Sequence, residues 1–425
     1  MDNTRTFDKI KIILFCTVLV IGFLLGLAFF LRPAYSETEK RELTKFPSFT
    51  VGTFLSGEYT EQVSTWFADT FPFREGLIAA NDAISSLKGF ASEQFQSGAS
   101  SQGGNENQNT PGGEDVKVEQ IAGYYITGDT AYEMYYQNVA NSKRYAEVIN
   151  TAASRLAGKA KVYTVVVPLA YAYNDKVLGK TDASDPKAAI DSIYTSVTDL
   201  NAVCVDAYGA LAAHKNEYLY FRTDHHWTAL GAYYAYTAYC ASNPALTAYP
   251  LSSYEECKFE GFLGTLYTHT KAPALAKNPD TVHAYVPMAT NTLRVHLADG
   301  TSQKFTGGVV RKDTDTFYAN AASKDNCFLT SDNPAGTKQS YYISIENPNK
   351  TDGSAVVLVK ESFGNCFAPF LVDHYQYVYV IDYRYYDGDI VDFVNTTGAD
   401  SVIFLNNLTA TSASPRLDEM EKLVK

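Results

Sequence analysis

The chain has 425 residues, which is enough for one large domain or two smaller ones. Its formal net charge is −12, and no basic run follows the N-terminal region, which argues against a nucleic acid as partner. The 32 Tyr residues are mostly expected in the core or in half-buried strands, although exposed Tyr rings also suit carbohydrate.

An uncharged apolar run of residues covers positions 12–31, and basic residues precede and follow it. Its length matches a membrane-spanning helix and is long for the apolar core of a signal peptide. No small-residue cleavage site follows the run. We therefore predict that residues 1–35 form a short tail and an uncleaved, single-pass transmembrane signal anchor. We expect the rest of the chain to lie on the extracytoplasmic side of the cell membrane.

Three regions are predicted after the anchor. Residues 36–95 form an N-terminal helical region, because aromatic and aliphatic side chains recur there at helical spacing. Residues 96–116 form a flexible low-complexity loop, because they contain almost no apolar side chain that could be buried. Residues 117–425 form an α/β domain. Within it, residues 250–350 are predicted to be a β-rich insertion that shapes the substrate groove.

The α/β domain alternates strands with helices. Continuous apolar runs rich in β-branched residues, such as residues 162–168, are typical of parallel strands buried on both faces. The expected strands cover residues 122–127, 162–168, 203–206, 354–360, 377–382 and 401–405. The expected helices cover residues 141–156, 190–201, 228–240, 364–375 and 386–397. This alternation predicts a doubly wound parallel sheet.

The segment Asp224-His225-His226-Trp227 carries the strongest chemical signal. An Asp that orients a His makes two-thirds of a serine-hydrolase triad. Side chains two residues apart in a turn fall on one side, so Asp224 is expected to accept from His226 Nδ1. His225 is expected to point away, and His225 and Trp227 to support the pair from behind. The alternative role of this segment is a helix N-cap at residue 223 or 224.

Ser362 is the candidate nucleophile, because it follows a predicted buried strand and precedes the helix expected at 364–375. This position is the carboxyl edge of the sheet, where open α/β folds bind ligands. The N-terminus of that helix would add N–H groups for a developing oxyanion. A G-x-S-x-G elbow is absent, so strand, Ser and helix alone make a weak signal. The plain alternative is a Ser buried at a strand end.

Adjacent His side chains can also bind a metal ion. The chain has only seven His residues, with no further His or Glu at ligand spacing near His225 and His226, and it has no CxxC pair. We therefore predict neither a metal site nor another cofactor.

The sequence TDHHWT at 223–228 resembles the signature of the DHHW family. That family is similar to the alginate O-acetyltransferases, an SGNH hydrolase-like group. Further matching segments are 39–43, 69–74, 126–129 and ESFGN at 361–365. The chain departs from the family at Glu361, where an Asp is more usual.

The resemblance implies an SGNH hydrolase-like fold and roles for Asp224, His226, Ser362 and Arg384, whereas the role of Asn365 follows from its amide side chain at the expected helix start. Asp224 would orient His226, His226 would act as general base and acid, and Ser362 would become acetylated. Arg384 and Asn365 would bind the oxyanion or the substrate. The alternatives are a surface salt bridge for Arg384 and a helix cap for Asn365.

The function expected from this resemblance is O-acetylation of a cell-surface or exported polysaccharide. Acetyl-CoA does not occur outside the cell, so a membrane-bound O-acyltransferase partner would deliver the acetyl group. Two alternatives remain at this point: a carbohydrate O-acetyl esterase with the same triad, and a non-catalytic glycan-binding protein of the cell envelope. The transferase and the esterase share an acyl-enzyme, so the sequence does not separate them.

Overall fold

The computed structural model describes residues 119–425 except for positions 122, 180, 306–307, 313–326 and 330–339. Before residue 119 it describes single positions and short runs between 32 and 72. The chain divides into two compact units, Met1–Glu93 and Gln94–Lys425.

Several predictions from the sequence concern residues that are not described. The transmembrane segment at 12–31 and the flexible loop at 96–116 both lie outside the described residues. Over the described ranges, no helix combines the length and the apolar character that crossing a membrane requires. The signal anchor and the loop stay predictions.

In the first unit, strands β1 (Tyr35–Ser36) and β2 (Arg41–Glu42) pair antiparallel. The Arg32 guanidinium lies 4.1 Å from the centroid of the buried Trp66 ring, and its Nη1 donates to Thr70 Oγ1 at 2.8 Å. A cation over an indole face, together with this hydrogen bond, fixes the start of the described chain to the Trp66 segment.

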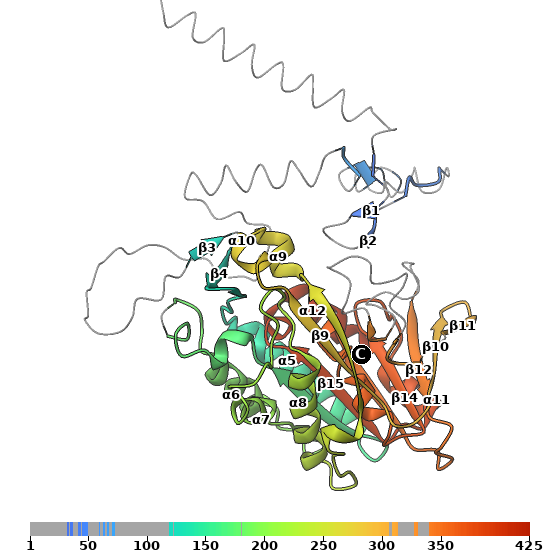
Figure 1. Cartoon of the computed structure of the whole chain (residues 1–425). Helices are drawn as coiled ribbons and strands as arrows, with labels where there is room; N and C mark the ends of the chain where they lie inside the picture. Colours follow the sequence, from blue (N-terminus) through green and yellow to red (C-terminus); the bar gives the residue numbers. More distant parts are fainter. Residues whose placement is uncertain are drawn as a thin grey trace, which may run out of the picture. The chain divides into compact units, whose positions relative to one another are not determined.

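The second unit is built on a sheet of eight described strands in the order β11-β10-β12-β14-β13-β15-β6-β7 (Figure 1). From β14 to β7 all neighbours are parallel, whereas β12, β10 and β11 are antiparallel to their neighbours. The strands are β6 (Lys161–Val167), β7 (Ala202–Cys204), β10 (Thr292–Leu297), β11 (Ser302–Phe305), β12 (Tyr341–Glu346), β13 (Ala355–Lys360), β14 (Tyr377–Asp382) and β15 (Ser401–Asn407).

The predicted α/β class is confirmed, but the prediction of a wholly parallel sheet is wrong. All three antiparallel strands lie within the segment 250–350, which was predicted to be an insertion. The alternation of buried and half-buried side chains along β10 and β12 is typical of strands that cover one core face, whereas β11 at the edge is mostly exposed. The sheet is therefore mixed, with the antiparallel strands at one edge.

Two cores lie on opposite faces of the sheet, because successive side chains of a strand point to opposite sides. Along β6, Val165 and Val167 belong to one core and Val162 and Val166 to the other. The first core includes side chains of α7 and α8, and the second includes side chains of α5, α6, α11 and α12. Burial on both faces explains why the parallel strands have continuous apolar sequences.

The helices begin at side-chain caps that the sequence provides. Asn138, Asp185 and Asp389 accept from first-turn N–H groups of α5, α6 and α11, and Thr228 does so for α8. The helices are α5 (Val139–Arg155), α6 (Pro186–Ser196), α7 (Ala207–Ala212), α8 (Ala229–Ser242), α9 (Thr265–Thr270), α10 (Pro273–Ala276), α11 (Ile390–Thr397) and α12 (Ser414–Leu423).

The α-helix predicted at 364–375 is wrong. The chain forms two short 3₁₀ turns there, η5 (Ser362–Gly364) and η6 (Ala368–Leu371). Pro369 lacks an N–H donor and disfavours the α conformation of the residue before it, which prevents one continuous α-helix. A 3₁₀ turn of three residues has little dipole, so any stabilisation of charge near Ser362 has to come from individual groups.

A smaller lobe lies beside the main sheet. Strands β3 (Glu119–Ile121), β4 (Tyr124–Thr127) and β5 (Thr130–Tyr132) form a meander, and β8 (Glu255–Phe262) pairs with β9 (Asp280–Val286). Apolar side chains of β4 and β5 pack against α9 and α10 in a separate small core: Ile126, Ala131, Leu266, Ala272 and Leu275. The N-terminal meander and the segment after β8 thus form one packed body.

His374 shows how burial makes the fold sensitive to pH. Its Nε2 lies 2.6 Å from Tyr236 Oη, and its ring stacks on Tyr249. Tyr249 N–H donates to Tyr236 Oη, so we assign the Tyr236 hydroxyl as donor to a neutral His374. Burial, with a smaller effect of the charge on Lys350, lowers the pKa of His374 to about 4.

We predict that stability falls as the pH is lowered from about 6.5 toward 4. In this window an unfolded His, with a pKa of about 6.5, binds a proton while folded His374 does not. Protonation therefore favours the unfolded chain. Urea unfolding at several pH values should show a smaller loss in His374→Gln than in the wild type. His214→Gln, at a half-exposed site, is the control. An unchanged pH dependence in His374→Gln would contradict this assignment.

Candidate active site

The DHHW segment is a tight loop whose two ends are paired. Tyr220 and Trp227 form an isolated antiparallel bridge, and Phe221 N–H donates to the carbonyl of His226 at 3.2 Å. The loop leads directly into α8, which is capped by Thr228 rather than by residue 223 or 224. Asp224 is therefore not the helix cap that the sequence left as an alternative.

Asp280, at the start of β9, holds the base of this loop. Its fully buried carboxylate accepts from Thr223 N at 2.8 Å and from Thr223 Oγ1 at 2.6 Å. It also pairs with Arg222 Nη2 at 3.2 Å and accepts from the Tyr218 hydroxyl. A buried carboxylate with this many donors fixes the backbone on which the next residue, Asp224, is carried.

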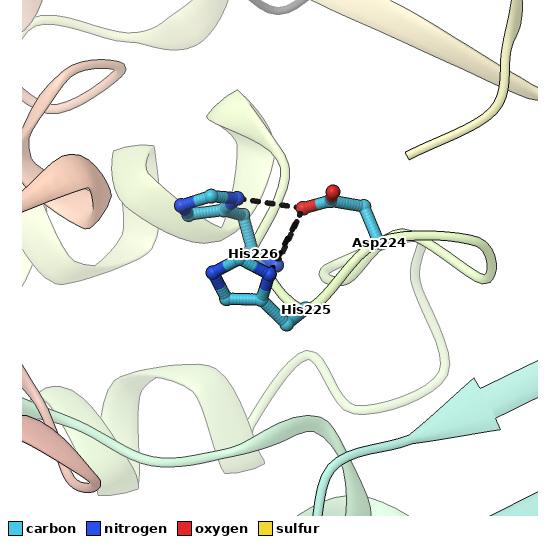
Figure 2. Close-up of side chains that lie close together, drawn as sticks. All are labelled: Asp224, His225 and His226. Carbon is cyan, nitrogen blue, oxygen red and sulfur yellow. Dashed lines mark hydrogen bonds and ion pairs between the residues drawn. The ribbon is translucent and has the colours of Figure 1, made fainter. Parts of the chain in front are cut away.

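The structure brings Asp224, His226 and Ser362 into one hydrogen-bonded line. Asp224 Oδ1 lies 2.6 Å from His226 Nδ1, and Figure 2 draws this hydrogen bond as a dashed line. On the other side of the ring, His226 Nε2 lies 2.7 Å from Ser362 Oγ, across 136 positions of sequence. Because the carboxylate accepts at Nδ1, we assign the proton to Nδ1 and leave Nε2 as the acceptor for the Ser362 hydroxyl.

The Asp224 carboxylate is almost fully buried, and each of its oxygens accepts two hydrogen bonds. Oδ1 accepts from His226 Nδ1 and N, and Oδ2 accepts from Thr265 N at 2.7 Å and Thr265 Oγ1 at 2.9 Å. Burial alone would raise the pKa of Asp224, but the two neighbouring His charges and these N–H donors hold it well below its usual value. Asp224 therefore stays ionised.

Gly264 is required by this arrangement. A Cβ atom on Gly264 would lie 2.2 Å from Asp224 Cβ and 2.3 Å from Asp224 Oδ2. Only glycine lets the backbone pass close enough for Thr265 N–H to reach the carboxylate.

The expectation that His225 points away from Asp224 is wrong. Both imidazoles turn toward the same carboxylate oxygen, with His225 Nδ1 at 3.9 Å from Asp224 Oδ1 (Figure 2). His225 Nδ1 also lies 2.6 Å from Thr265 Oγ1. Since that hydroxyl donates to Asp224, it accepts from His225, so the proton of His225 is assigned to Nδ1. His225 thus supports Asp224 through Thr265.

Trp227 ties the DHHW loop to the turn that carries Ser362. Its indole Nε1 donates to the carbonyl of Phe363 at 2.9 Å, and its side chain is almost completely buried. The ring of Phe363 in turn packs against His226, with centroids 4.9 Å apart. These contacts fix the distance between His226 and Ser362.

Glu361 shapes the turn at Ser362 from the other side. Its buried carboxylate accepts from Asn407 N at 3.0 Å and from Phe363 N at 3.2 Å, which joins the ends of β13 and β15. Ser362 Oγ lies 3.1 Å from Glu361 Oε2, farther than from His226 Nε2. The single Ser362 proton therefore has two acceptors, and the shorter contact is to His226.

Arg384 and Asn365 are linked indirectly, through the buried side chains of Lys360 and Asp382. Arg384 therefore does not form the surface salt bridge that the sequence left as an alternative. Lys360 Nζ donates to Asn365 Oδ1 at 2.8 Å and to Asp382 Oδ2 at 2.9 Å, and both Lys360 and Asp382 are 2% exposed. Arg384 binds Asp382 through two nitrogens, at 2.8 and 2.6 Å. Since Lys360 donates only to an oxygen, the other end of the Asn365 amide is its donor end.

Four residues of this environment were not found from the sequence. They are Gly264, Thr265, Asp280 and Lys360. The first three contact the DHHW loop from 41 to 57 positions away, a separation at which spacing carries no signal. In the sequence, Lys360 looks like an ordinary polar residue at the end of a strand. Its burial depends on Asp382, its partner on the neighbouring strand, which the local sequence does not indicate.

Asp224, His225 and His226 also have the composition of a partial metal site, with one ligand atom of each within 4.8 Å of the others. An ion there would have to replace hydrogen-bond donors that already occupy the Asp224 carboxylate. It would also compete with Ser362 for His226 Nε2. The geometry therefore fits a hydrogen-bonded line better than a metal ligand set.

We predict that Asp280→Ala lowers the unfolding free energy by about 3 kcal/mol, because it leaves buried N–H and hydroxyl donors and Arg222 without their acceptor. Urea denaturation measures the change. Asp387→Ala, which removes an exposed carboxylate, should change it by less than about 0.5 kcal/mol. Equal effects of the two substitutions would show that Asp280 does not hold the loop.

Comparison with solved structures shows a common fold. A DHHW family protein from Eubacterium siraeum is 27% identical, with a TM-score of 0.61, over 72% of this chain and 97% of that chain. Bacillus cereus PatB1, solved with a sulfonyl adduct, is 14% identical with a TM-score of 0.55 over the same shares of the two chains. For PatB1 the likeness concerns the fold alone.

The O-acetyltransferase domain of Pseudomonas putida AlgJ matches over 72% of this chain and 98% of that chain, at 10% identity. Its TM-score of 0.38 is too low to bear on function. No curated protein matched the sequence. The DHHW family model matches residues 39–109 and 103–381, which together cover most of the chain. The chain therefore belongs to the DHHW family.

Proposed function

We propose that the protein is an O-acetyltransferase that acetylates a polysaccharide through an acetyl-Ser362 intermediate. One observation carries the proposal: Ser362 Oγ lies 2.7 Å from His226 Nε2, and the opposite nitrogen of that ring lies 2.6 Å from the buried Asp224 carboxylate. A serine becomes a good nucleophile when a base takes its proton, and this arrangement provides an oriented base.

In the first half-reaction Ser362 Oγ attacks the carbonyl carbon of the acetyl donor, and its proton moves to His226 Nε2. The tetrahedral intermediate collapses, His226 gives the proton to the leaving group, and acetyl-Ser362 remains. In the second half-reaction His226 takes the proton of an acceptor hydroxyl, whose oxygen attacks the acetyl carbon. Ser362 Oγ leaves and recovers the proton from His226. Asp224 stays ionised throughout and stabilises the charged imidazole.

The developing oxyanion needs a donor, and Asn365 is the one that we propose. Its Oδ1 is held by Lys360, which directs the amide N–H₂ end outward from that charge. Arg384 donates to Asp382, and the same carboxylate accepts from Lys360 and holds it in place. In this proposal Lys360 and Arg384 are positioning residues that act through Asn365. A fixed donor of this kind accounts for about 10²- to 10³-fold in rate in other serine enzymes.

The setting that we propose is the outer side of the cell membrane, with residues 12–31 as a single-pass anchor. The length and apolar character of that run support the anchor. Acetyl-CoA is absent there, so a membrane-bound O-acyltransferase would supply the acetyl group. The acceptor would be a cell-surface or exported polysaccharide.

A carbohydrate O-acetyl esterase is the second candidate. The same arrangement of Asp224, His226 and Ser362 can activate a water molecule, which then attacks acetyl-Ser362 in place of a sugar hydroxyl. The two functions differ in which molecule reaches acetyl-Ser362. An oligosaccharide that gains the mass of one acetyl group identifies the transferase. Acetate release alone, across many acceptors, identifies the esterase.

We predict that Ser362→Ala and His226→Ala each lower the hydrolysis of 4-nitrophenyl acetate at least about 10³-fold, because members of a triad act as a unit. Circular dichroism checks that both variants fold. Ser253→Ala, at an exposed 3₁₀ turn, is the control and should match the wild type. Near-normal activity in a folded Ser362→Ala protein would leave the non-catalytic glycan-binding role as the better explanation.

We predict that Lys360→Met lowers kcat about 10- to 100-fold and changes KM little, because Asn365 loses the contact that orients it. In an Asn365→Ala background the same substitution should have little further effect, since the two residues act on one interaction. Lys159→Met, at an exposed site, is the control. A loss that is fully additive in the double variant would show that Lys360 does not act through Asn365.

A further inference from the structure

Three side chains beside the DHHW loop take no part in the chemistry proposed above. They are Tyr124, Glu133 and His269, and we call them the acceptor wall. Tyr124 begins β4, and His269 lies on α9. Tyr124 Oη lies 2.9 Å from His269 Nδ1, and the two rings stack with an interplanar angle of 23°. Tyr124 is half-buried, and His269 is packed on one side and open to solvent on the other, so the pair presents an aromatic surface to solvent.

Glu133 is held between the two segments that carry His226 and Ser362. It follows β5, whose Ala131 N–H donates to the carbonyl of Arg222 at 2.9 Å, two residues before Asp224. On its other side, Glu133 Oε1 lies 3.5 Å from Thr409 Oγ1. Thr409 follows β15, the strand whose end is tied to Glu361 beside Ser362. The half-buried carboxyl group thus has structural links to both halves of the site.

Charge couples the acceptor wall to the residues around His226. Burial raises the pKa of Glu133 to about 7, and the charges on Glu361 and Asp224 also raise it, whereas that on His226 lowers it. Burial, Glu133 and Asp224 raise the pKa of Tyr124. Burial lowers the pKa of His269, which also senses Asp224 and Lys271. These groups lie close enough to influence a molecule bound next to His226.

The acceptor wall combines two kinds of group that recognise a sugar. An aromatic face packs against the C–H groups of a pyranose ring, and a carboxylate accepts a hydrogen bond from a hydroxyl group. Glu133, Asp224 and Glu361 place three carboxyl groups around this site. A uronate unit would add a fourth negative charge, so an uncharged unit fits better.

We propose that Tyr124, His269 and Glu133 form the subsite for the acceptor sugar, with an uncharged pyranose over the aromatic pair and one of its hydroxyls hydrogen-bonded to Glu133. This inference rests on the proposed transferase function. It gives Glu133 a role in choosing the sugar over water as the nucleophile that attacks acetyl-Ser362. Its signature is the ratio of acetyl transfer to hydrolysis, since both reactions start from one acyl-enzyme.

The test uses the full chain with 4-nitrophenyl acetate as donor and cellopentaose or pentagalacturonate as acceptor. Glu133→Gln and Tyr124→Leu should each lower the ratio of acetylated cellopentaose to acetate about tenfold, the effect of losing one charged hydrogen bond or one sugar contact. Glu147→Gln, an exposed carboxylate on α5, is the matched control. Pentagalacturonate should be the poorer acceptor for the wild type.

The pH dependence separates recognition from a purely structural effect. In the wild type the ratio should rise from pH 6 to pH 8 as Glu133 ionises and becomes a better acceptor. In Glu133→Gln the ratio should be flat. Titration of His226 affects transfer and hydrolysis alike and therefore cancels in the ratio. Asp224, Glu361, Tyr124, His269 and Lys271 are the same in both proteins, so their titration does not account for a difference between the two.

Labelling with phenylmethylsulfonyl fluoride distinguishes failure of the subsite from failure of the proposed function. If Ser362 of the wild type is not sulfonylated and no acetate is released, the proposed function is wrong. If Ser362 reacts, the acceptor wall is refuted by a wild-type ratio in Glu133→Gln. Hydrolysis alone with both acceptors favours the esterase over the transferase, and the acceptor wall then falls with the function on which it rests. Preference for pentagalacturonate would overturn the assignment of an uncharged sugar.

Discussion

The candidate site depends on one buried carboxylate, that of Asp224. Its two oxygens accept four hydrogen bonds, two from His226 and two from Thr265. An isolated buried charge is costly, and this one is stabilised because every acceptor position is filled. The DHHW motif is therefore incomplete by itself. Thr265, which follows Gly264 some forty residues onward, supplies half of the donors, one from its backbone N–H and one from its hydroxyl.

This dependence explains why the segment after α8 belongs to the site and is not a peripheral addition. Thr265 begins α9, and Asp280 begins β9, so one stretch of chain fixes both Asp224 and the base of its loop. The same α9 packs on the N-terminal meander, which carries Tyr124. Support for the carboxylate and the proposed sugar subsite thus share one small packed body. A change in that body is expected to affect both.

Ser362 reaches His226 because the sheet sets its position. It lies just beyond β13, between the parallel strands β14 and β15. Glu361 binds the end of β15, and Trp227 binds the carbonyl of Phe363. A serine held by neighbouring residues on both sides has little freedom, which suits a nucleophile that must meet a fixed base.

Much of the fold followed from sequence patterns. Runs of β-branched residues located β6, β13, β14 and β15, because strands buried on both faces need continuous apolar sequence. The antiparallel edge strands were not assigned to the main sheet, since pairing between distant segments leaves no local signal. The helix predicted after Ser362 failed because Pro369 interrupts it, and local periodicity outweighed that residue in the prediction.

For the site, spacing and the family resemblance pointed to Asp224, His226 and Ser362, which the structure brings together. Arg384 and Asn365 lie in a network centred on Lys360 and Asp382, which no spacing rule suggests. The orientation of His225 was mispredicted because side chains of adjacent residues were assumed to diverge. The loop curvature instead turns both rings to one oxygen.

The most direct measurement is the covalent state of Ser362 during turnover. The protein is mixed with 4-nitrophenyl acetate, quenched in acid within the first turnovers, digested and examined by mass spectrometry. The proposed chemistry predicts one acetyl group on the peptide that contains Ser362, and none on that peptide from His226→Ala. Acetylation confined to other residues, or an equal signal in His226→Ala, would contradict the claim that His226 activates Ser362.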